Sequence, residues 1–585
     1  MHPEEGVEVT ASPAVADDAG RRALVALVGV TLLSLVVRLQ SLGARTFHWD
    51  EGRVGYWILR YHETGRFSYR PIIHGPFIQH VDALLFHVVP ATDFWARVPV
   101  AVITAALPLS AWLLRRHLDE VELVSLGLLL TLDPLLLYYS RFMRSDALVG
   151  TFAFVAFTLL VRAFDTRRPR LVYPAVVSFA FAFGSKENAL VYVLCLLGAG
   201  ALAYDHQLVR AATREIGAFD RLKTDLTATR SWLDDASGET PSALWLAGVF
   251  SGATLAFLAV IVLLYAPRPD IWTALDGPRQ FANVVDSATV EAGNRFVEGW
   301  VETGHREHPY VAFLHDMLET LLYGSAVVLT LAVVGFVVDG YGGDGRILVA
   351  FTSYWGAVSI IGYPIATDIQ APWAAFHVVL PLTVTAAVGV AALVRLVERG
   401  VATDDRATVA LAALVLTGAA AGIVVANGDY WNSAAEEDRK VLQWAQPENE
   451  LKPTLAVVDA VVRKNEGRDV LFYAGDDDRF HVANESSLDQ PPPGGPSWHS
   501  RLPLPWYLER AGATVTSTPA ETTATEAMSD APAVVIAAAE DRDALESRLE
   551  GYAVAEHRFK LWGEGIVVFV DRDAIREAGL EPSAL

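Results

Sequence analysis

The stretch ALVALVGVTLLSLVVRLQSLGARTFHWDEG, residues 23–52, determines how the rest of the chain is interpreted. Its first part is apolar and close to the roughly 20 residues that a helix needs to cross about 30 Å of hydrocarbon. The part that follows ends on two adjacent carboxylates and has no small-residue cleavage site of the kind that ends a signal peptide. We therefore expect an anchoring helix that holds Asp50 and Glu51 at the membrane surface.

The composition extends this interpretation to most of the chain. Of the 585 residues, 52% are apolar or aromatic and 19% are charged, and the mean hydropathy is +0.31. Such a chain is too apolar for an ordinary soluble enzyme. We expect an α-helical polytopic membrane protein whose spans, about eleven, lie near residues 23–40, 94–114, 121–139, 146–164, 171–184, 188–204, 243–265, 321–338, 347–363, 373–394 and 407–426.

The negative charge is concentrated at the end of the chain. The formal net charge is −22, and residues 427–585 hold 29 Asp and Glu against 15 Lys and Arg, a net charge of −14. Short apolar runs at 470–473, 533–536 and 565–570 alternate there with helical stretches near 452–465, 503–511 and 541–549, which predicts a small α/β domain. The expected domains are a polar tail at 1–22, a transmembrane domain at 23–426 with a re-entrant first outer loop at 41–93, and the acidic α/β domain at 427–585.

Charge and cysteine content exclude some classes of partner. A strongly negative chain argues against binding to nucleic acid. Arginine far outnumbers lysine beside this acidity, which suggests a salt-rich habitat. The single cysteine, Cys195, excludes an intrachain disulfide and a metal site built from thiolates.

Basic residues beside short loops set the expected orientation, because cytoplasmic loops collect lysine and arginine. They fall on one side of the expected spans, at Arg21-Arg22, Arg115-Arg116, 167–170, 205–242 and the Arg395/Arg399/Arg406 group. We place this side, with the N-terminus, in the cytoplasm. The chain is then a multi-pass protein of the cell membrane with its first outer loop and its acidic domain outside the cell.

Asp50 and Glu51 are candidates for general base catalysis. They lie where an aromatic belt meets water, with apolar surface close enough to raise a carboxyl pKa toward the range that a base needs. Side chains of neighbouring residues diverge on a helix or a strand, so only one of the two points squarely at a reacting atom. We expect Asp50 to be the base and Glu51 to support it or bind sugar hydroxyls. The alternative is that both carboxylates end the helix and solvate the loop.

A second candidate stretch, residues 138–146, places two arginines on the outer border. If it is helical, Arg141 and Arg144 lie three residues apart on one face and aim two guanidinium groups at one anion. Arg97 lies at the same border, at the start of the second span. The alternative is that Ser145 caps the next span, Asp146 lies in its first turn, and the arginines extend toward water.

Other polar groups carry weaker signals. Lys186 adds a cation in an outer turn, where an ion pair within the protein is the default explanation. His74, His80 and His87 are spaced by six and seven residues, which matches no compact pair of metal ligands. No metal site is therefore expected from these histidines.

The order of these motifs resembles the GT-C superfamily of integral-membrane glycosyltransferases, in particular its protein mannosyltransferase and aminoarabinose-transferase-like branch. The resemblance covers residues 23 to about 200 and rests on Asp50-Glu51, His74-Gly75-Pro76-Phe77, Arg97-Val98-Pro99, Asp133-Pro134 and Tyr138-Tyr139-Ser140-Arg141. Gly75 departs from the second proline of the family turn. The segment 503–508 and the overall layout resemble the archaeal flippase-activity-associated branch.

The resemblance implies a polyprenyl- or dolichyl-phosphate-linked sugar as donor, used on the extracytoplasmic face, with inversion at the anomeric carbon. It implies that Arg141 and Arg144, with Arg97 or Lys186, hold the phosphate, and His74 is included in the substrate-binding set. Asp50 would accept the proton of the acceptor, while Asp146 or Glu51 orients the sugar or the acceptor. The acceptor would be a glycan, a lipid or a protein. No cofactor is required; a divalent metal bound by Asp50, Glu51 and Asp146 is the disfavoured alternative.

Two other functions compete with sugar transfer. The same arginines and outer loop could bind a lipid-linked sugar while it moves between leaflets, which would make the chain a flippase or a flippase accessory. A secondary transporter is disfavoured because the ionisable residues cluster at the border and not at the midplane. In the tail, Trp498, His499, Trp506 and Tyr507 are expected either to stack on carbohydrate or, for the last two, to pack against their own sheet.

Overall fold

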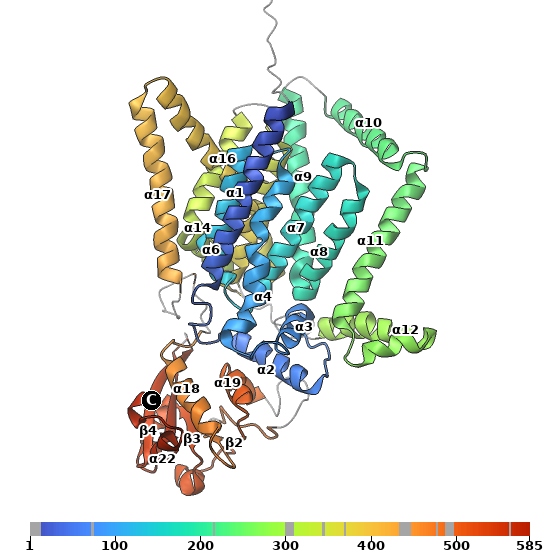
Figure 1. The fold of residues 1–585 in the computed structure, drawn as a ribbon. Coiled ribbons are helices and arrows are strands. Elements are labelled where there is room, and N and C mark those ends of the chain that lie inside the picture. The colour runs from blue at the N-terminus through green and yellow to red at the C-terminus, as the bar shows by residue number, and fades with distance from the viewer. Residues whose placement is uncertain are drawn as a thin grey trace, which may run out of the picture.

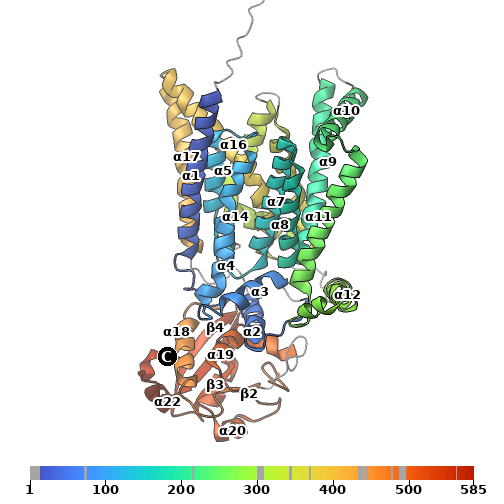
Figure 2. The same cartoon turned by 45° about the vertical axis from the view of Figure 1, so that its right-hand side comes forward.

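The structure is a computed structural model of the chain. It describes residues 13–71, 75–213, 217–298, 309–341, 345–367, 370–431, 441, 446–475, 478–485, 496–560 and 563–585. Most of the expected polar tail, and His74, lie outside these residues. Figures 1 and 2 show a bundle of long helices at the top and a smaller α/β domain beneath it.

The bundle contains a helix at each of the eleven expected positions. The helices are α1 (Pro13–Leu39), α4 (Asp93–Ala105) continued by a 3-10 helix (Leu107–Leu114), α5 (Glu120–Leu132), α6 (Pro134–Tyr139), α7 (Ser145–Thr166), α8 (Val172–Ser185), α9 (Leu190–Thr213), α11 (Ser242–Tyr265), α14 (Tyr310–Tyr341), α15 (Ile347–Ala366), α16 (Ala375–Ala402) and α17 (Arg406–Tyr430). Helix α1 begins ten residues before the expected start of its span.

Among the described residues, nine helical segments are long and apolar enough to cross a membrane. The other two expected spans differ from a simple crossing helix. The span expected at 121–139 is broken into α5 and α6 at Asp133, whose extended backbone (φ −55°, ψ 129°) precedes Pro134; a residue before proline disfavours helical geometry. The span expected at 171–184 is α8, of 14 residues. The polytopic helical fold is confirmed, while a count of eleven crossings stays a prediction.

Burial separates central helices from peripheral ones. In α16, 78% of the apolar stretch is buried inside the protein, whereas in α17 and α11 the buried shares are 6% and 11%. Figure 1 places α17 at one edge of the bundle and α11 at the other. The exposed apolar side chains of α17 include Leu411, Leu414 and Val424, which fits a helix whose outer surface faces lipid.

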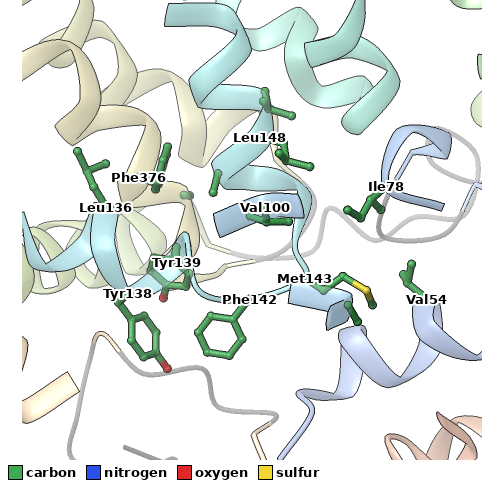
Figure 3. Packing of buried hydrophobic residues seen from close by; sticks show 14 of the residues in the cluster. Val54, Ile78, Val100, Leu136, Tyr138, Tyr139, Phe142, Met143, Leu148 and Phe376 are labelled. Carbon is green, nitrogen blue, oxygen red and sulfur yellow. The ribbon is translucent and has the colours of Figure 1, made fainter. Parts of the chain in front are cut away.

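The first outer loop forms the junction between the bundle and the α/β domain. It contains α2 (Trp49–Thr64) and α3 (Pro76–Leu85), and both figures show them across the end of the bundle. Figure 3 shows buried residues of this region, among them Val54 and Ile78 of the loop and Met143 of the turn before α7, which belong to one hydrophobic cluster. In Figure 1, two further helices lie beside α11. Helix α10 (Ala218–Ser237) lies at the border opposite to α2, and α12 (Pro278–Asp286) lies at the same border as α2. The short helix α13 (Ala292–Phe296) follows α12 in the chain.

The C-terminal part is a small α/β domain, as expected. Its five-stranded sheet has the order β2-β1-β3-β5-β4, with β1 parallel to β2 and β3, and β5 antiparallel to β3 and β4. The elements are α18 (Leu451–Val462), β1 (Val470–Phe472), α19 (Leu504–Ala511), β2 (Val515–Ser517), α20 (Ala524–Ala527), β3 (Val534–Ala538), α21 (Arg542–Glu546), β4 (Tyr552–Lys560), β5 (Glu564–Asp571) and α22 (Arg572–Glu577).

The aromatic side chains of Trp498, His499, Trp506 and Tyr507 pack on the first outer loop. Trp506 is stacked on Phe47 with ring centroids 4.7 Å apart, and Tyr507 contacts the same ring edge-on. Trp498 and His499 contact the rings of Tyr56 and Trp49. Trp498, Trp506 and Tyr507 are buried, which argues against stacking on carbohydrate, and the ring contacts of Trp506 and Tyr507 with Phe47 are made to the first outer loop.

Candidate active site

The two carboxylates of the first outer loop lie in the first turn of α2, with His48 as the N-cap. The Asp50 backbone N–H donates to His48 Nδ1 at 3.0 Å, and the His48 N–H donates to Glu51 Oε2 at 2.9 Å. This reciprocal capping fixes the start of the helix. Both carboxylates are buried. They therefore begin a helix and do not solvate a loop.

Glu51 is fully bound by the protein. Arg97 donates to it from Nε at 2.8 Å and from Nη2 at 2.6 Å, and the Met143 N–H donates at 2.7 Å. Burial alone would raise the pKa of Glu51, but the Arg97 charge and hydrogen bonds, with the backbone donors of His48 and Met143, hold it below its ordinary value of 4.5. Arg97 also donates to three loop carbonyls, those of Leu42, Arg45 and Thr46. This pair organises the loop.

Asp50 faces a different group of side chains. Its Oδ2 accepts a hydrogen bond from Arg144 Nη1 and lies 3.5 Å from His48 Nδ1. Arg144 Nη2 lies 3.6 Å from Asp146 Oδ2, and the guanidinium stands 4.0 Å over the ring of Trp373. One arginine thus joins two of the three expected catalytic carboxylates.

Asp146 extends the cluster into the bundle. It lies in the first turn of α7, accepts a hydrogen bond from Lys186 Nζ at 3.0 Å, and lies 3.7 Å from His377 Nε2. The other nitrogen of His377 is 2.7 Å from the Tyr192 hydroxyl, and its ring is stacked on Tyr363. Lys186 thus forms an ion pair within the protein, which is the default explanation for this cation, and its partner is Asp146 in the first turn of α7.

Arg141 and Arg144 do not lie on one helix face. Residues 140–143 form a turn between α6 and α7, and Arg144 has an extended backbone at the N-cap of α7. Arg141 donates to the carbonyls of Gln40 at 2.7 Å and Trp431 at 3.1 Å. The expected paired forks are therefore wrong in their geometry, because a tight turn rotates successive side chains to different partners.

Ser145 does not cap α7 either. The helix begins at this residue, and Arg144 occupies the cap position without a side-chain hydrogen bond. The Ser145 hydroxyl is buried and, within the described part of the chain, has no hydrogen-bond partner. Asp146 occupies the first turn as expected.

Five residues in contact with the cluster were not predicted: His48, Tyr192, Tyr363, Trp373 and His377. A signal existed for His377, because an ionisable side chain inside an apolar span is by default a functional candidate. Trp373 and Tyr192 carried no distinguishing pattern among the many aromatic residues of the spans.

The carboxylates considered for a metal each face a cation: Glu51 faces Arg97, Asp50 faces Arg144, and Asp146 faces Lys186. These ion pairs occupy both oxygens of Glu51 and one oxygen each of Asp50 and Asp146, and the absence of a metal stays a prediction. Elsewhere in the described residues, a group with metal-ligand spacing is formed by His315, Asp316 and Glu319 at the start of α14.

Two family models match different parts of the chain. A family model described as dolichyl-phosphate-mannose-protein mannosyltransferase matches residues 73–216. A second, described as the Agl23 flippase-associated protein C-terminal domain, matches residues 451–571. No curated protein sequence matches the chain significantly.

The fold has neighbours among solved structures. ArnT from Cupriavidus metallidurans in the apo state is similar with a TM-score of 0.52, 14% identity, and coverage of 92% of this chain and 97% of that chain. The structure of ArnT bound to undecaprenyl phosphate gives a TM-score of 0.54 at the same identity and coverage. The chain has the GT-C fold and an Agl23-type C-terminal domain.

The predicted resemblance to the GT-C superfamily and its Agl23 branch is thereby confirmed. AglB from Archaeoglobus fulgidus, in complex with an inhibitory peptide and a dolichol-phosphate, is less similar, with a TM-score of 0.46, 11% identity, and coverage of 92% of this chain and 74% of that chain. In this chain the buried cluster lies at the end of the bundle that meets the C-terminal domain.

Proposed function

We propose that this protein is a membrane glycosyltransferase that moves a sugar from a polyprenyl- or dolichyl-phosphate donor to a glycan, lipid or protein acceptor in cell-surface glycosylation. The observation that carries the proposal is the group of Asp50, Arg144 and Asp146, which are buried, and the partly buried Lys186, in which two cations stand beside two carboxylates at one end of the bundle. The names of the matched family and of the ArnT complex, which refer to dolichyl-phosphate-mannose and undecaprenyl phosphate, support the same donor class.

The cluster suits the chemistry of a lipid-phosphate donor. A phosphate leaving group is already ionised at neutral pH, so the reaction needs cations on the phosphate and a base on the acceptor rather than a strong acid. Arg144 and Lys186 supply the cations. When the donor phosphate binds, Arg144 turns from Asp50 to the phosphate, and this frees the Asp50 carboxylate.

In the transfer step, residues of the cluster accept the proton of the acceptor and stabilise the phosphate that leaves. The acceptor hydroxyl gives its proton to Asp50 while its oxygen bonds to the anomeric carbon. The bond from that carbon to the phosphate oxygen breaks, and its electron pair stays on the phosphate beside Arg144 and Lys186. Attack opposite the leaving group inverts the anomeric configuration. Asp146 positions Lys186, and Glu51 with Arg97 positions the loop; the phosphate roles of Arg141 and His74 stay predictions from the resemblance.

The orientation belongs to the same proposal. Donor use on the extracytoplasmic face requires the α2 end of the bundle and the acidic domain to lie outside the cell, with the N-terminus in the cytoplasm. The basic residues beside the opposite loops support this arrangement.

Asp50→Asn tests the assignment, because the amide keeps the shape of the side chain and cannot accept the proton. Transfer of radiolabelled sugar from a panel of dolichyl-phosphate hexoses is expected to fall by a factor on the order of 10² to 10⁴, while binding of dolichyl phosphate is retained. Asp543→Asn, on the exposed α21, is the matched control. Unchanged transfer in Asp50→Asn would remove the catalytic role of Asp50.

A second candidate function is movement of a lipid-linked sugar between leaflets without transfer. The match of residues 451–571 to a flippase-associated domain favours it. In that case the wild-type protein in vesicles would change the side of the membrane on which dolichyl-phosphate hexose is accessible, and Asp50→Asn would leave this movement intact.

A further inference from the structure

Asp93 connects the C-terminal domain to the first outer loop. It is the first residue of α4 and is buried, with 4% of its surface exposed. Its two carboxylate oxygens accept hydrogen bonds from four residues of the C-terminal domain: Trp506 Nε1 at 3.0 Å, Tyr507 Oη at 2.9 Å, Lys452 Nζ at 2.7 Å and Arg510 Nη1 at 3.2 Å. Buried ions need such partners, so the contact is built and not incidental.

The same domain holds the residues just before Asp50. The Phe47 N–H donates to the Tyr507 hydroxyl at 2.8 Å, so this hydroxyl bridges Asp93 and Phe47. On either side, Gln446 Nε2 donates to the Thr46 carbonyl at 2.7 Å, and Trp49 Nε1 donates to the His499 carbonyl at 3.0 Å. The C-terminal domain thus binds the backbone of Thr46 and Phe47 and the side chain of Trp49, which lead into the first turn of α2.

Glycines bring α2 close to α19. A Cβ atom on Gly52 would lie 2.4 Å from Pro503 Cβ and 2.5 Å from its Cα, and one on Gly55 would lie 2.7 Å from the ring of Trp506. No side chain fits at these distances without a shift of the neighbour. The face of α2 that carries Gly52 and Gly55 is therefore fitted against the C-terminal domain.

Helix α4 joins the two sets of contacts. Asp93 and Arg97 lie four residues apart, one turn along the same face. Asp93 binds the C-terminal domain, while Arg97 binds Glu51, the residue next to Asp50.

We propose that Tyr507 and Asp93 are positioning residues through which the C-terminal domain holds the Asp50-Glu51 turn in the candidate active site. The domain completes the catalytic arrangement without touching the reacting atoms. The proposal rests on the proposed function for its catalytic part, whereas its structural part can be measured without sugar transfer.

Tyr507→Phe tests the bridge, because it removes one hydroxyl and keeps the ring. Amide hydrogen exchange of residues 46–52 is expected to become about tenfold faster, and kcat of transfer to fall about tenfold, the size expected for one lost hydrogen bond. KM for the donor is expected to stay unchanged, because Arg144 and Lys186 are untouched. Tyr552→Phe is the control: it removes a hydroxyl of the same domain that donates to the Pro532 carbonyl at 2.8 Å, away from the loop.

Gly52→Ala gives an independent perturbation of the same contact, with Gly248→Ala on α11, where a new Cβ meets open space, as its control. Gly52→Ala is expected to accelerate exchange of residues 46–52 and reduce kcat, and Gly248→Ala to do neither. Unchanged exchange in both Tyr507→Phe and Gly52→Ala would overturn the inference, as would faster exchange with wild-type kcat. If the wild-type chain transfers no sugar from any donor, the proposed function fails, while the exchange data still decide whether the domain holds the turn.

Discussion

Asp50 and Glu51 are neighbours in the chain, but their surroundings give them different tasks. The Glu51 carboxylate accepts four hydrogen bonds, two from Arg97 and one each from the backbone N–H groups of His48 and Met143. Asp50 is bound mainly by Arg144, a cation that also reaches Asp146. A carboxylate that shares its partner can exchange it for a substrate, whereas one held by four donors cannot without disrupting the loop.

Glu51→Gln is expected to destabilise the protein by roughly 3–5 kcal/mol, because it leaves the buried Arg97 without its counter-ion. The pKa of Glu51 is lowered in the folded state, so the stability from its ionisation is present above the ordinary value of 4.5 and is lost as pH falls through the folded pKa. Unfolding midpoints measured from pH 7 down to 3 should fall for the wild type in this range. A Glu51→Gln variant that matched the wild type at pH 7 would contradict the prediction.

For Asp82 on α3 we expect the opposite dependence of stability on pH. It is buried, and neither carboxylate oxygen has a hydrogen-bond partner among the described residues, so burial raises the pKa of Asp82 well above its ordinary 3.8. The folded state then binds more protons than the unfolded state, and stability falls as pH rises from 3.8 through the folded pKa. Asp82→Asn should therefore raise the unfolding midpoint at pH 7 and lose this advantage near pH 3. An equal midpoint at pH 7 would show that burial does not raise the pKa of Asp82 in the folded state.

Sequence patterns located the residues of the cluster better than their contacts. Asp50, Arg144, Asp146 and Lys186 were all chosen as border residues, and the structure brings these four together. Arg97 and Arg141 lie at the same border, but Arg97 binds Glu51 and three loop carbonyls, and Arg141 binds the carbonyls of Gln40 and Trp431. The difference lies in turn geometry and in carbonyl positions, which hydropathy and spacing do not specify.

Helices α14 and α16 pack closely together at two glycines, Gly335 and Gly389. A Cβ atom on Gly335 would lie 2.0 Å from the Thr385 carbonyl oxygen, and one on Gly389 would lie 2.1 Å from that of Leu331. Small residues allow helix backbones to approach in a membrane, where packing rather than hydrophobic burial drives association. This crossing fixes the central helix α16, which carries His377.

Gly335→Ala is expected to separate α14 from α16 and lower the thermal unfolding midpoint of the detergent-solubilised protein. Gly340→Ala on the same helix meets open space and is expected to leave the midpoint unchanged. Equal midpoints for the two variants would mean that the crossing tolerates a methyl group at both places.

Broken helices were harder to predict than long ones. The apolar run 121–139 favours one span, but Asp133 accepts hydrogen bonds from the Leu136 N–H at 3.1 Å and from Ser325 Oγ at 2.9 Å. Ser325 itself has non-helical dihedral angles inside α14. Two interruptions far apart in sequence thus meet, and such pairing has no local signature. Strands β1, β3 and β5 followed from apolar runs, whereas β2 and β4 were missed because they are less buried.

For the whole molecule, the single cysteine allows a direct test of orientation. Cys195 is buried, so Cys195→Ala should leave a background without accessible thiol. In intact cells, Ser529→Cys in the C-terminal domain is expected to react with a membrane-impermeant maleimide, whereas Thr403→Cys, in the loop after α16, reacts only after the membrane is opened. The reverse pattern would invert the proposed topology.

The contact between Asp93 and α19 also bears on biosynthesis. Asp93 leaves the ribosome about 400 residues before its partners Trp506, Tyr507 and Arg510. During that interval a carboxylate that is buried in the finished protein has none of these three partners. Contacts between such distant residues form late in folding. The Asp50-Glu51 turn therefore acquires its final support only when translation is nearly complete, so a truncated chain can insert its helices and still lack a finished site.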